Sequence, residues 1–175
     1  MTDLYDELWN DSWKTWYDTY FMELLAEPLE ANWGKFDLMA RILVTTTASS
    51  SAIAGWQLWQ EPGYKTGWVV IAGIASLASI IHSVFQVSSK VKYWSEAKGN
   101  CSKLRHKLQV LRYRMKTEPK NIKKLNDEYL TYKDNFAKLD ASIVNSDLFM
   151  TEKLKVATQS KLDSMVAKNG TSQLP

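Results

Sequence analysis

The side chains that most often carry catalysis are scarce in this sequence. It contains two histidines, His82 and His106, and one cysteine, Cys101. These three residues cannot supply the four ligands of a structural Cys/His zinc site. Cys101 and His106 lie five residues apart, a spacing that does not bring a thiol and a base to one helix face, and no glycine-rich loop precedes a lysine at P-loop spacing. The sequence therefore predicts no enzyme: no catalytic, cofactor-binding or metal-binding residues, and no cofactor.

Two long uncharged stretches occupy the centre of the chain. The stronger, TGWVVIAGIASLASIIHSVFQVSS, covers residues 66–89, and the weaker, ILVTTTASSSAIAGWQLWQ, covers residues 42–60. About 20 helical residues span the hydrocarbon core of a bilayer, whereas a soluble core helix normally carries charges on an exposed face. Only EPGYKT, residues 61–66, with its Pro-Gly turn signal, separates the two stretches. The pattern predicts a transmembrane hairpin, with a soluble helical hairpin as the alternative.

The residues around these stretches give the hairpin an orientation. Its predicted extent is residues 38–89, with spans at about 40–60 and 67–89. Aromatic side chains that favour a membrane–water interface gather near the turn: Trp56, Trp59, Tyr64 and Trp68. Basic side chains gather at the other end: Lys35, Arg41, Lys90 and Lys92. Because basic residues mark the cytoplasmic side, we expect both termini in the cytoplasm and the short turn on the outer side of the membrane.

Small and polar side chains form a polar face on both predicted spans. They are Ser76, Ser79, Ser83 and Gln86 on the second span, and Thr45 and Ser49 on the first. Small residues allow close helix packing in lipid, so one interpretation is that these faces hold the two spans together. The other is that they line a water-filled path, which requires a homo-oligomer because two helices cannot enclose a pore. His82, an ionisable group at membrane depth, is a candidate for the same roles.

A second region, residues 90–170, follows the spans. Its apolar side chains alternate spacings of three and four, which is a heptad seam: Trp94, Ala97, Cys101, Leu104, Leu108, Leu111 and Met115. Pro119 then breaks the helix, and a second seam begins: Ile122, Leu125, Tyr129, Tyr132, Phe136, Leu139 and Ile143. Two seams joined by a proline turn predict a cytoplasmic antiparallel helical hairpin, and the first seam is also a candidate oligomer contact. Its register extends back to Gly73, so the second span and the first hairpin helix are expected to form one continuous rod.

The two ends of the chain are also predicted to be helical. Residues 1–37 hold nine acidic residues and two lysines, with an aromatic helix face: Tyr5, Trp9, Trp13, Trp16, Tyr20 and Leu24. Because the stretch after residue 90 is basic, we expect this helix to pack on the hairpin of its own chain or a neighbour's; a membrane-surface helix is the alternative. A C-terminal helix should begin near a cap at Ser146 or Asp147 and end at Gly170. The tail at residues 171–175 is expected to be disordered.

Six basic residues near the predicted hairpin tip form a candidate partner patch: Arg112, Arg114, Lys116, Lys120, Lys123 and Lys124. Membrane topology explains basic residues beside a span, but that rule fades about 20 residues from the membrane. A charge run on a helix is most simply a solvated face. An acidic protein or a nucleic acid is an alternative partner, and nucleic acid is the less expected because no base-reading motif accompanies the charge.

The segments together predict an all-α membrane protein: an amphipathic N-terminal helix, a two-helix transmembrane hairpin, a cytoplasmic antiparallel helical hairpin and a C-terminal helix. This order, together with the stretch KVKYWSEAKGNCSKLRHKL at residues 90–108 and its Trp94, resembles the SLATT superfamily of two-transmembrane effectors found beside bacterial nucleotide-signalling and conflict systems. The plan is also similar to that of membrane accessory proteins of RNA-targeting CRISPR systems.

The resemblance implies an oligomeric inner-membrane effector of a prokaryotic antiviral defence system, which forms a pore or otherwise permeabilises or depolarises the membrane. It implies membrane lipid and further copies of the chain as partners, with a defence-system sensor or nuclease as a candidate third partner. A membrane-anchored scaffold whose basic hairpin recruits a protein or nucleic acid is the second hypothesis. A phage-type lysis protein ranks third, because the long region after residue 89 exceeds what lysis requires.

Overall fold

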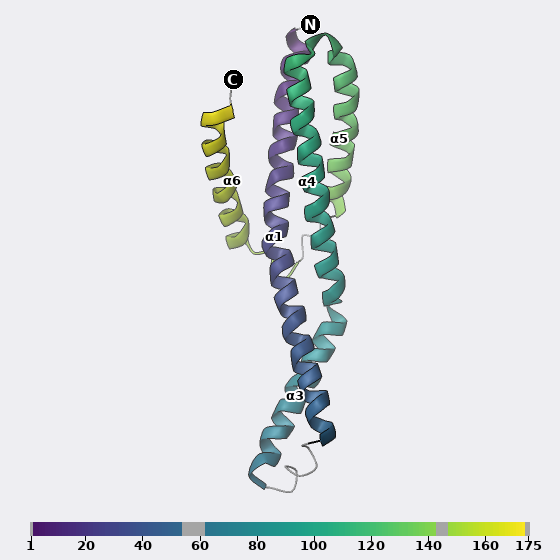
Figure 1. The fold of residues 1–175 in the computed structure, drawn as a ribbon, viewed down its shortest axis with the longest axis vertical. Coiled ribbons are helices and arrows are strands. Elements are labelled where there is room, and N and C mark those ends of the chain that lie inside the picture. The colour runs from purple at the N-terminus through teal and green to yellow at the C-terminus, as the bar shows by residue number, and fades with distance from the viewer. Residues whose placement is uncertain (1, 54–61, 143–146, 174–175) are drawn as a thin grey trace. The chain divides into compact units, whose positions relative to one another are not determined.

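The computed structural model describes residues 2–53, 62–142 and 147–173 of the chain. The regular elements of this part are all helical (Figure 1): α1 (Thr2–Ile53), α3 (Pro62–Val84), α4 (Val87–Thr117), α5 (Ile122–Ser142) and α6 (Glu152–Gln173), with a 3-10 turn at Pro119–Asn121. The prediction of an all-α fold is confirmed for the described residues. The chain divides into two compact units: unit 1 comprises Met1–Leu29 and Trp94–Pro175, and unit 2 comprises Glu30–Tyr93.

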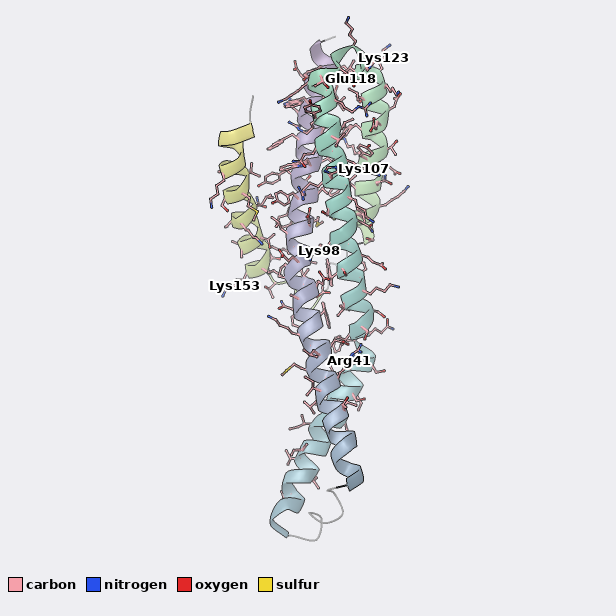
Figure 2. The ribbon with its side chains drawn as sticks, in the orientation of Figure 1. Arg41, Lys98, Lys107, Glu118, Lys123 and Lys153 are labelled. Carbon is pink, nitrogen blue, oxygen red and sulfur yellow. The ribbon has the colours of Figure 1, made fainter. Side chains whose placement is uncertain are left out.

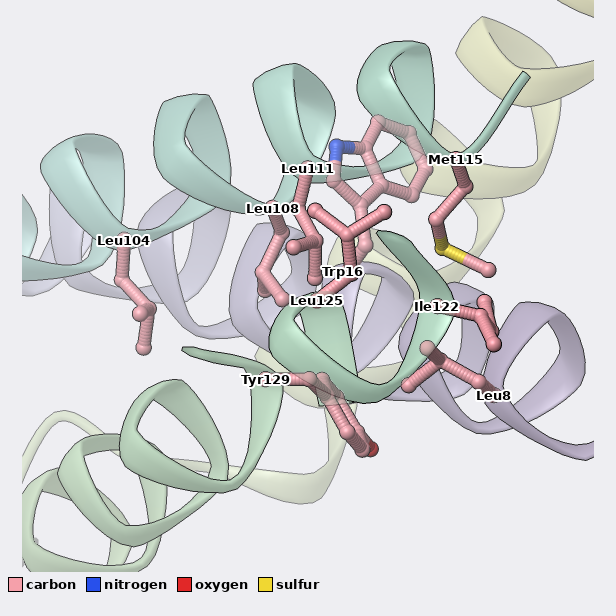
Figure 3. Close-up of a cluster of buried hydrophobic side chains, with 9 residues drawn as sticks. All are labelled: Leu8, Trp16, Leu104, Leu108, Leu111, Met115, Ile122, Leu125 and Tyr129. Atoms are coloured by element: carbon pink, nitrogen blue, oxygen red, sulfur yellow. The ribbon is translucent and has the colours of Figure 1, made fainter. Parts of the chain in front are cut away.

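Unit 1 is built around a core cluster that α1, α4 and α5 share (Figure 3): Leu8, Trp16, Leu104, Leu108, Leu111, Met115, Ile122, Leu125 and Tyr129. Each of these side chains is at most 9 % exposed. Fully burying one leucine or methionine side chain stabilises a fold by about 1.5–3 kcal/mol. The cluster is therefore a major source of stability for unit 1.

The two heptad seams predicted from the sequence meet in this core cluster. In Figure 1, α4 and α5 lie side by side and run in opposite directions, joined through the 3-10 turn that starts at Pro119. Across the pair, Arg114 Nη1 lies 2.7 Å from Glu128 Oε2. The predicted antiparallel helical hairpin is confirmed, and its first seam is buried within a single chain. Ile143, the last residue of the second seam, lies outside the described residues.

The N-terminal part of α1 packs on this hairpin in the same chain, as the opposite charges of the two segments led us to expect. Arg105 of α4 pairs with Glu23 of α1, with Nε 2.6 Å from Oε2 and Nη2 3.3 Å from Oε1. The Arg105 guanidinium also lies 4.7 Å from the centroid of the Tyr20 ring. Charge complementarity therefore predicted the right partner for this helix.

The face that α1 buries includes most of the predicted aromatic face and a row of hydroxyl side chains beside it. Trp16 and Leu24 are at most 9 % exposed, and Tyr5, Trp9 and Tyr20 pack against the core cluster. Ser12, Thr15 and Thr19 are at most 6 % exposed, whereas Trp13 of the aromatic face is 39 % exposed. Short hydroxyl side chains are buried at low cost here because they hydrogen-bond to carbonyls of their own helix. Ser12 Oγ donates to the Trp9 carbonyl at 3.0 Å, and Thr19 Oγ1 donates to the Thr15 carbonyl at 2.6 Å.

The ends of α6 also differ from the prediction. The Leu154 N–H donates to Thr151 Oγ1 at 3.2 Å, so Thr151 rather than Asp147 is the N-cap, and Ser146 lies outside the described residues. At the other end the helix continues past Gly170, because a glycine inside a helix costs only about 1 kcal/mol. The helix therefore includes the first residues of the predicted disordered tail.

Asp147 has a different role, because it ties the segment before α6 to α4. Its buried carboxylate accepts hydrogen bonds from Trp94 Nε1 at 2.9 Å and from the Phe149 N–H at 3.0 Å. Farther along α6, Lys161 Nζ lies 3.3 Å from Glu27 Oε2 of α1. The segment before α6 is thus bonded to α4, and α6 itself is paired with α1, within unit 1.

Unit 2 contains the C-terminal part of α1 together with α3. The sequence placed a turn at Pro62–Gly63, but Pro62 is the first residue of α3. A proline suits this position, because its missing N–H would have no partner inside the helix. Trp56 and Trp59, expected near the turn, lie outside the described residues.

None of the described helices has both the length and the hydropathy of a membrane span by itself. The segments Val69–Val84 and Val87–Thr117 meet those criteria only as a pair, with a 46° bend between them. The predicted continuous rod is therefore wrong. A break separates α3 from α4, and Gln86 within it has a φ of 48°, a conformation that costs a residue with a Cβ about 1–2 kcal/mol.

Candidate functional site

The carboxylate of Asp37 joins three helices in unit 2. Its Oδ1 accepts hydrogen bonds from His82 Nε2 at 2.8 Å and from Ser88 Oγ at 3.0 Å, and its Oδ2 lies 2.8 Å from Arg41 Nε. Arg41 Nη2 also donates to Ser88 Oγ at 3.4 Å. We call these four residues, which come from α1, α3 and α4, the Asp37 cluster.

The neighbours of Asp37 stabilise its ionised form. The hydrogen bond from His82, with smaller contributions from Ser88 and Arg41, holds the pKa of the Asp37 carboxyl below its usual value, although burial acts in the opposite direction. Asp37 is therefore a carboxylate at neutral pH, and its two oxygens are both engaged. A negative charge held in this way keeps α1, α3 and the start of α4 together.

The Asp37 cluster gives a physical reason for the break between α3 and α4. His82 and Ser88 lie six residues apart, so at about 100° per residue an unbroken helix would place them on different faces. The positive φ at Gln86 turns the chain so that both side chains reach the same carboxylate oxygen. The hydrogen bonds on either side of the break offset the backbone strain at this residue.

The predicted polar face of the second span is not the face by which α3 packs in unit 2. Ser76, Ser79, Ser83 and Gln86 are all exposed. The covered face instead carries Ala75, Ala78 and His82, at spacings of three and four, and Ala75 is 6 % exposed. Of the two predicted residues on the first span, Thr45 is exposed, and the side chain of Ser49 lies outside the described part.

Apolar side chains cover much of the remaining surface of α3. They are Val69, Val70, Ile71, Ile74, Leu77, Ile80 and Val84, and they are 49–71 % exposed. Leu38, Met39 and Ile42 on the neighbouring part of α1 are 55–66 % exposed. An apolar surface of this extent is unusual on a monomer in water and marks a contact with lipid or protein.

The predicted basic patch is only partly available to a partner. Arg112 lies against α1, with its guanidinium 3.7 Å from the centroid of the Trp9 ring and 5.0 Å from that of Trp13. It also donates from Nη1 to the Trp9 carbonyl at 2.8 Å and to Ser12 Oγ at 3.2 Å. Burial lowers the pKa of the Arg112 guanidinium to about 10, so it remains charged at neutral pH.

The other members of the patch differ in what they contact. Arg114 forms the ion pair with Glu128 described above, and Lys116 is exposed with its Nζ 5.3 Å from the Trp9 ring. The side chains of Lys120, Lys123 and Lys124 are exposed at the turn between α4 and α5 and the start of α5, and Figure 2 shows Lys123 at this turn. The free basic surface is thus made of lysines rather than arginines.

The two residues that could have formed a nucleophile–base pair do not lie in a common site. Cys101 is 2 % exposed in the first seam, and burial, followed by the charge of Glu23, raises the pKa of its thiol to about 11. His106 is exposed on the same helix. Within the described ranges no group of three or more histidine, cysteine, aspartate or glutamate side chains could hold a metal ion.

The sequence did not predict the role of two residues that organise the structure: Asp37 was not a candidate residue, and Arg112 was assigned to the partner patch rather than to a contact with α1. The sequence held one local signal for Asp37. It precedes Arg41 by four residues, and oppositely charged side chains at this spacing on a helix attract each other. For Arg112 no local pattern indicated that it would stack on tryptophans about 100 positions away.

Comparisons of the chain with protein-family models, with curated proteins and with solved structures find no match. The resemblance to the SLATT superfamily therefore remains a prediction that depends on residues 90–108 and on the order of the segments.

Proposed function

We propose that this protein is a homo-oligomeric membrane effector, in which unit 2 enters a lipid bilayer and several copies together permeabilise it. The observation that carries the proposal is the apolar surface of α3, where seven valine, isoleucine and leucine side chains are about half exposed or more. Transfer of such side chains from water to hydrocarbon is favourable by about 25 cal/mol for each Å² of apolar surface. Lipid is a partner that can cover all of these exposed side chains at once.

The polar groups at the C-terminal end of α3 are consistent with the placement of unit 2 in a bilayer. An ionisable group near the hydrocarbon is costly unless it is paired. His82 is bonded to Asp37, which Arg41 and Ser88 also contact. The Asp37 cluster would thus lie where the apolar surface ends and the headgroups begin.

The exposed serines of α3 support the permeabilising role. In a single chain, Ser76, Ser79 and Ser83 are exposed on a face of α3 other than the covered one, so neighbouring copies or water can contact this face. Serines are found where helices approach closely in lipid. A ring of copies that turns this face inward would enclose a polar path.

Replacing the three serines tests this role. The variant Ser76→Leu/Ser79→Leu/Ser83→Leu would dewet the path, because apolar constrictions exclude water. Overexpressed in bacterial cells, it should reach the membrane fraction at the wild-type level and fail to depolarise the cells, as measured with a voltage-sensitive dye. The matched control Val70→Leu/Ile74→Leu/Val84→Leu changes the same number of residues on the apolar side and should depolarise like the wild type.

Two outcomes would contradict the proposal. Full depolarisation by a well-expressed serine variant would remove this face from the conducting path. Absence of the wild-type protein from the membrane fraction would overturn the membrane role altogether.

A membrane-anchored scaffold is the second candidate, and the lysines at the turn between α4 and α5 favour it. Lys120, Lys123 and Lys124 are exposed and form no ion pair within the described part of the chain. Against this role, Arg112 and Arg114 are engaged within unit 1. A scaffold would recruit its partner without depolarising the cell, so the dye measurement separates the two functions.

The biological setting is proposed from the resemblance alone. A SLATT-like effector implies the inner membrane of a bacterium, termini in the cytoplasm and an antiviral defence system with a sensor or nuclease upstream. Depolarisation that appears only when such a partner is co-expressed would support this setting.

A further inference from the structure

A groove of about 360 Å³ lies between α4 and α5 in unit 1. Its lining consists of Asn100, Lys103, Leu104 and Lys107 from α4 and Asn135, Lys138 and Leu139 from α5. Pockets for small ligands start at about 300 Å³, so the groove is large enough for a small organic molecule. Three of its side chains are cations, two are amides and two are leucines.

The two walls of the groove repeat one sequence pattern. Residues 100–104 read NCSKL and residues 135–139 read NFAKL, so each helix presents Asn-x-x-Lys-Leu. Residues spaced by three and four lie on one helix face, which places the asparagine, the lysine and the leucine of each motif together.

The register of the hairpin brings the two motifs level with each other. Lys107, labelled on α4 in Figure 2, has its Nζ 5.7 Å from the centroid of the Tyr132 ring of α5. Because the helices are antiparallel, the residues before Lys107 on α4 lie opposite the residues after Tyr132 on α5. The motif at 100–104 therefore lies opposite the motif at 135–139. An antiparallel pair of equal motifs has approximate two-fold symmetry, so the groove offers a lysine and an amide from each side.

The positive charge of the groove is largely uncompensated. Lys138 Nζ lies 2.6 Å from Asp134 Oδ2, but both side chains are more than 60 % exposed, and an ion pair in water is weak. Neither Lys103 nor Lys107 forms an ion pair with any described residue. The floor is apolar by contrast, since Leu104 is 5 % exposed and Leu139 is partly buried against the core cluster.

We propose that this groove binds a small phosphate ester. Lysine ammonium groups bind phosphate as compact point charges, and three lysines line the groove. The asparagine amides can donate to further phosphate oxygens. The leucines leave room for an apolar portion of the ligand, and the two-sided arrangement of cations suits a molecule with two phosphate groups or one doubly charged phosphate.

The test measures binding to the full-length protein in detergent micelles by isothermal titration calorimetry. The probes are inorganic pyrophosphate, adenosine diphosphate, and a short-chain phosphatidylglycerol compared with a short-chain phosphatidylcholine. We expect one molecule of a phosphate probe to bind per chain in a saturable manner. If the soluble probes bind, the natural ligand is a free phosphate ester; if phosphatidylglycerol alone binds, it is a lipid headgroup.

Two double variants with the same change in net charge identify the site. Lys103→Gln/Lys138→Gln removes one cation from each wall, and we expect affinity to fall about tenfold or more, because charge-assisted hydrogen bonds are the strong ones. Lys123→Gln/Lys124→Gln removes two exposed cations outside the groove and should leave affinity within about twofold of the wild type. All four lysines are exposed, so neither change disturbs the core.

The proposal would be overturned if none of the phosphate probes bound in a saturable manner. It would equally be overturned if both double variants lost the same affinity, since binding would then follow net charge. These measurements need no membrane insertion or conduction, so their outcome is independent of the depolarisation assay.

Discussion

Arg112 provides a quantitative test of how α1 is held in unit 1. Its guanidinium stacks on the Trp9 ring and donates hydrogen bonds to the Trp9 carbonyl and to Ser12 Oγ. The variant Arg112→Met keeps an unbranched side chain that can cover the indole but removes the charge and the donors. Arg112→Lys keeps the charge and loses the planar group.

The expected loss follows from these contacts. A partly desolvated cation–π contact contributes about 0.5–2 kcal/mol, and a hydrogen bond from a charged group contributes about 1.5–3 kcal/mol. Part of this is offset, because a methionine no longer carries the desolvation cost that lowers the pKa of the arginine. We therefore expect Arg112→Met to lower the free energy of unfolding by about 2 kcal/mol and Arg112→Lys by about 1 kcal/mol.

Guanidinium denaturation of the full-length chain in detergent, followed by far-UV circular dichroism, measures these losses. The matched control is Lys120→Met, which removes an exposed charge in the turn after α4 and should change the unfolding free energy by less than about 0.5 kcal/mol. The double variant Trp9→Leu/Arg112→Met should lose less unfolding free energy than the sum of the losses of the two single variants, because both substitutions remove the same contact. An Arg112→Met protein as stable as the control would refute the assignment.

Further predictions concern the core, the break, the cluster and the thiol. Leu108→Asp, at a fully buried position, should lower stability by several kcal/mol, whereas Val110→Asp, at a 43 % exposed position, should change it little; equal melting temperatures would exclude Leu108 from the core. Gln86→Gly should raise the melting temperature and Gln86→Val should lower it, because the positive φ favours glycine; the reverse order would show that this backbone conformation is absent. Because the pKa of Asp37 is lowered in the folded chain, its contribution to stability is complete above the ordinary carboxyl pKa and is lost as pH falls through the lowered value. Asp37→Asn should therefore flatten this part of the stability–pH curve, and an unchanged curve would contradict the assignment. Cys101, with its thiol pKa raised to about 11, should react with a disulfide reagent at neutral pH only after unfolding, and rapid labelling of the folded chain would disprove its burial.

The hairpin of α4 and α5 could be predicted because its signals are local. The alternating spacing from Leu104 to Met115 fixes which side of α4 is buried, and Pro119 fixes where the helix stops. No distant residue is needed to read either signal.

The break after α3 could not be predicted in this way. Neither glycine nor proline occurs between Val84 and Val87, and Gln86 has no preference for a positive φ. The conformation depends on Asp37, about 50 residues earlier in the chain, whose carboxylate binds a residue on each side of the break. The heptad spacing of apolar residues continues through the break, so it predicted one continuous helix from the second span into α4.

The face of α1 shows why charge can identify the partner of a helix without identifying the surface that meets it. Attraction between an acidic helix and a basic hairpin acts over several ångströms and depends little on rotation of the helix about its axis. Rotation is decided at contact distance. There Ser12 and Thr15 fit against Arg112 and Tyr129, at 3.2 Å and 2.9 Å, where an indole would hold the helices apart. Trp9 and Trp13 lie beside this contact, where the same arginine that bonds to Ser12 stacks on them, whereas Trp16 is buried in the core cluster.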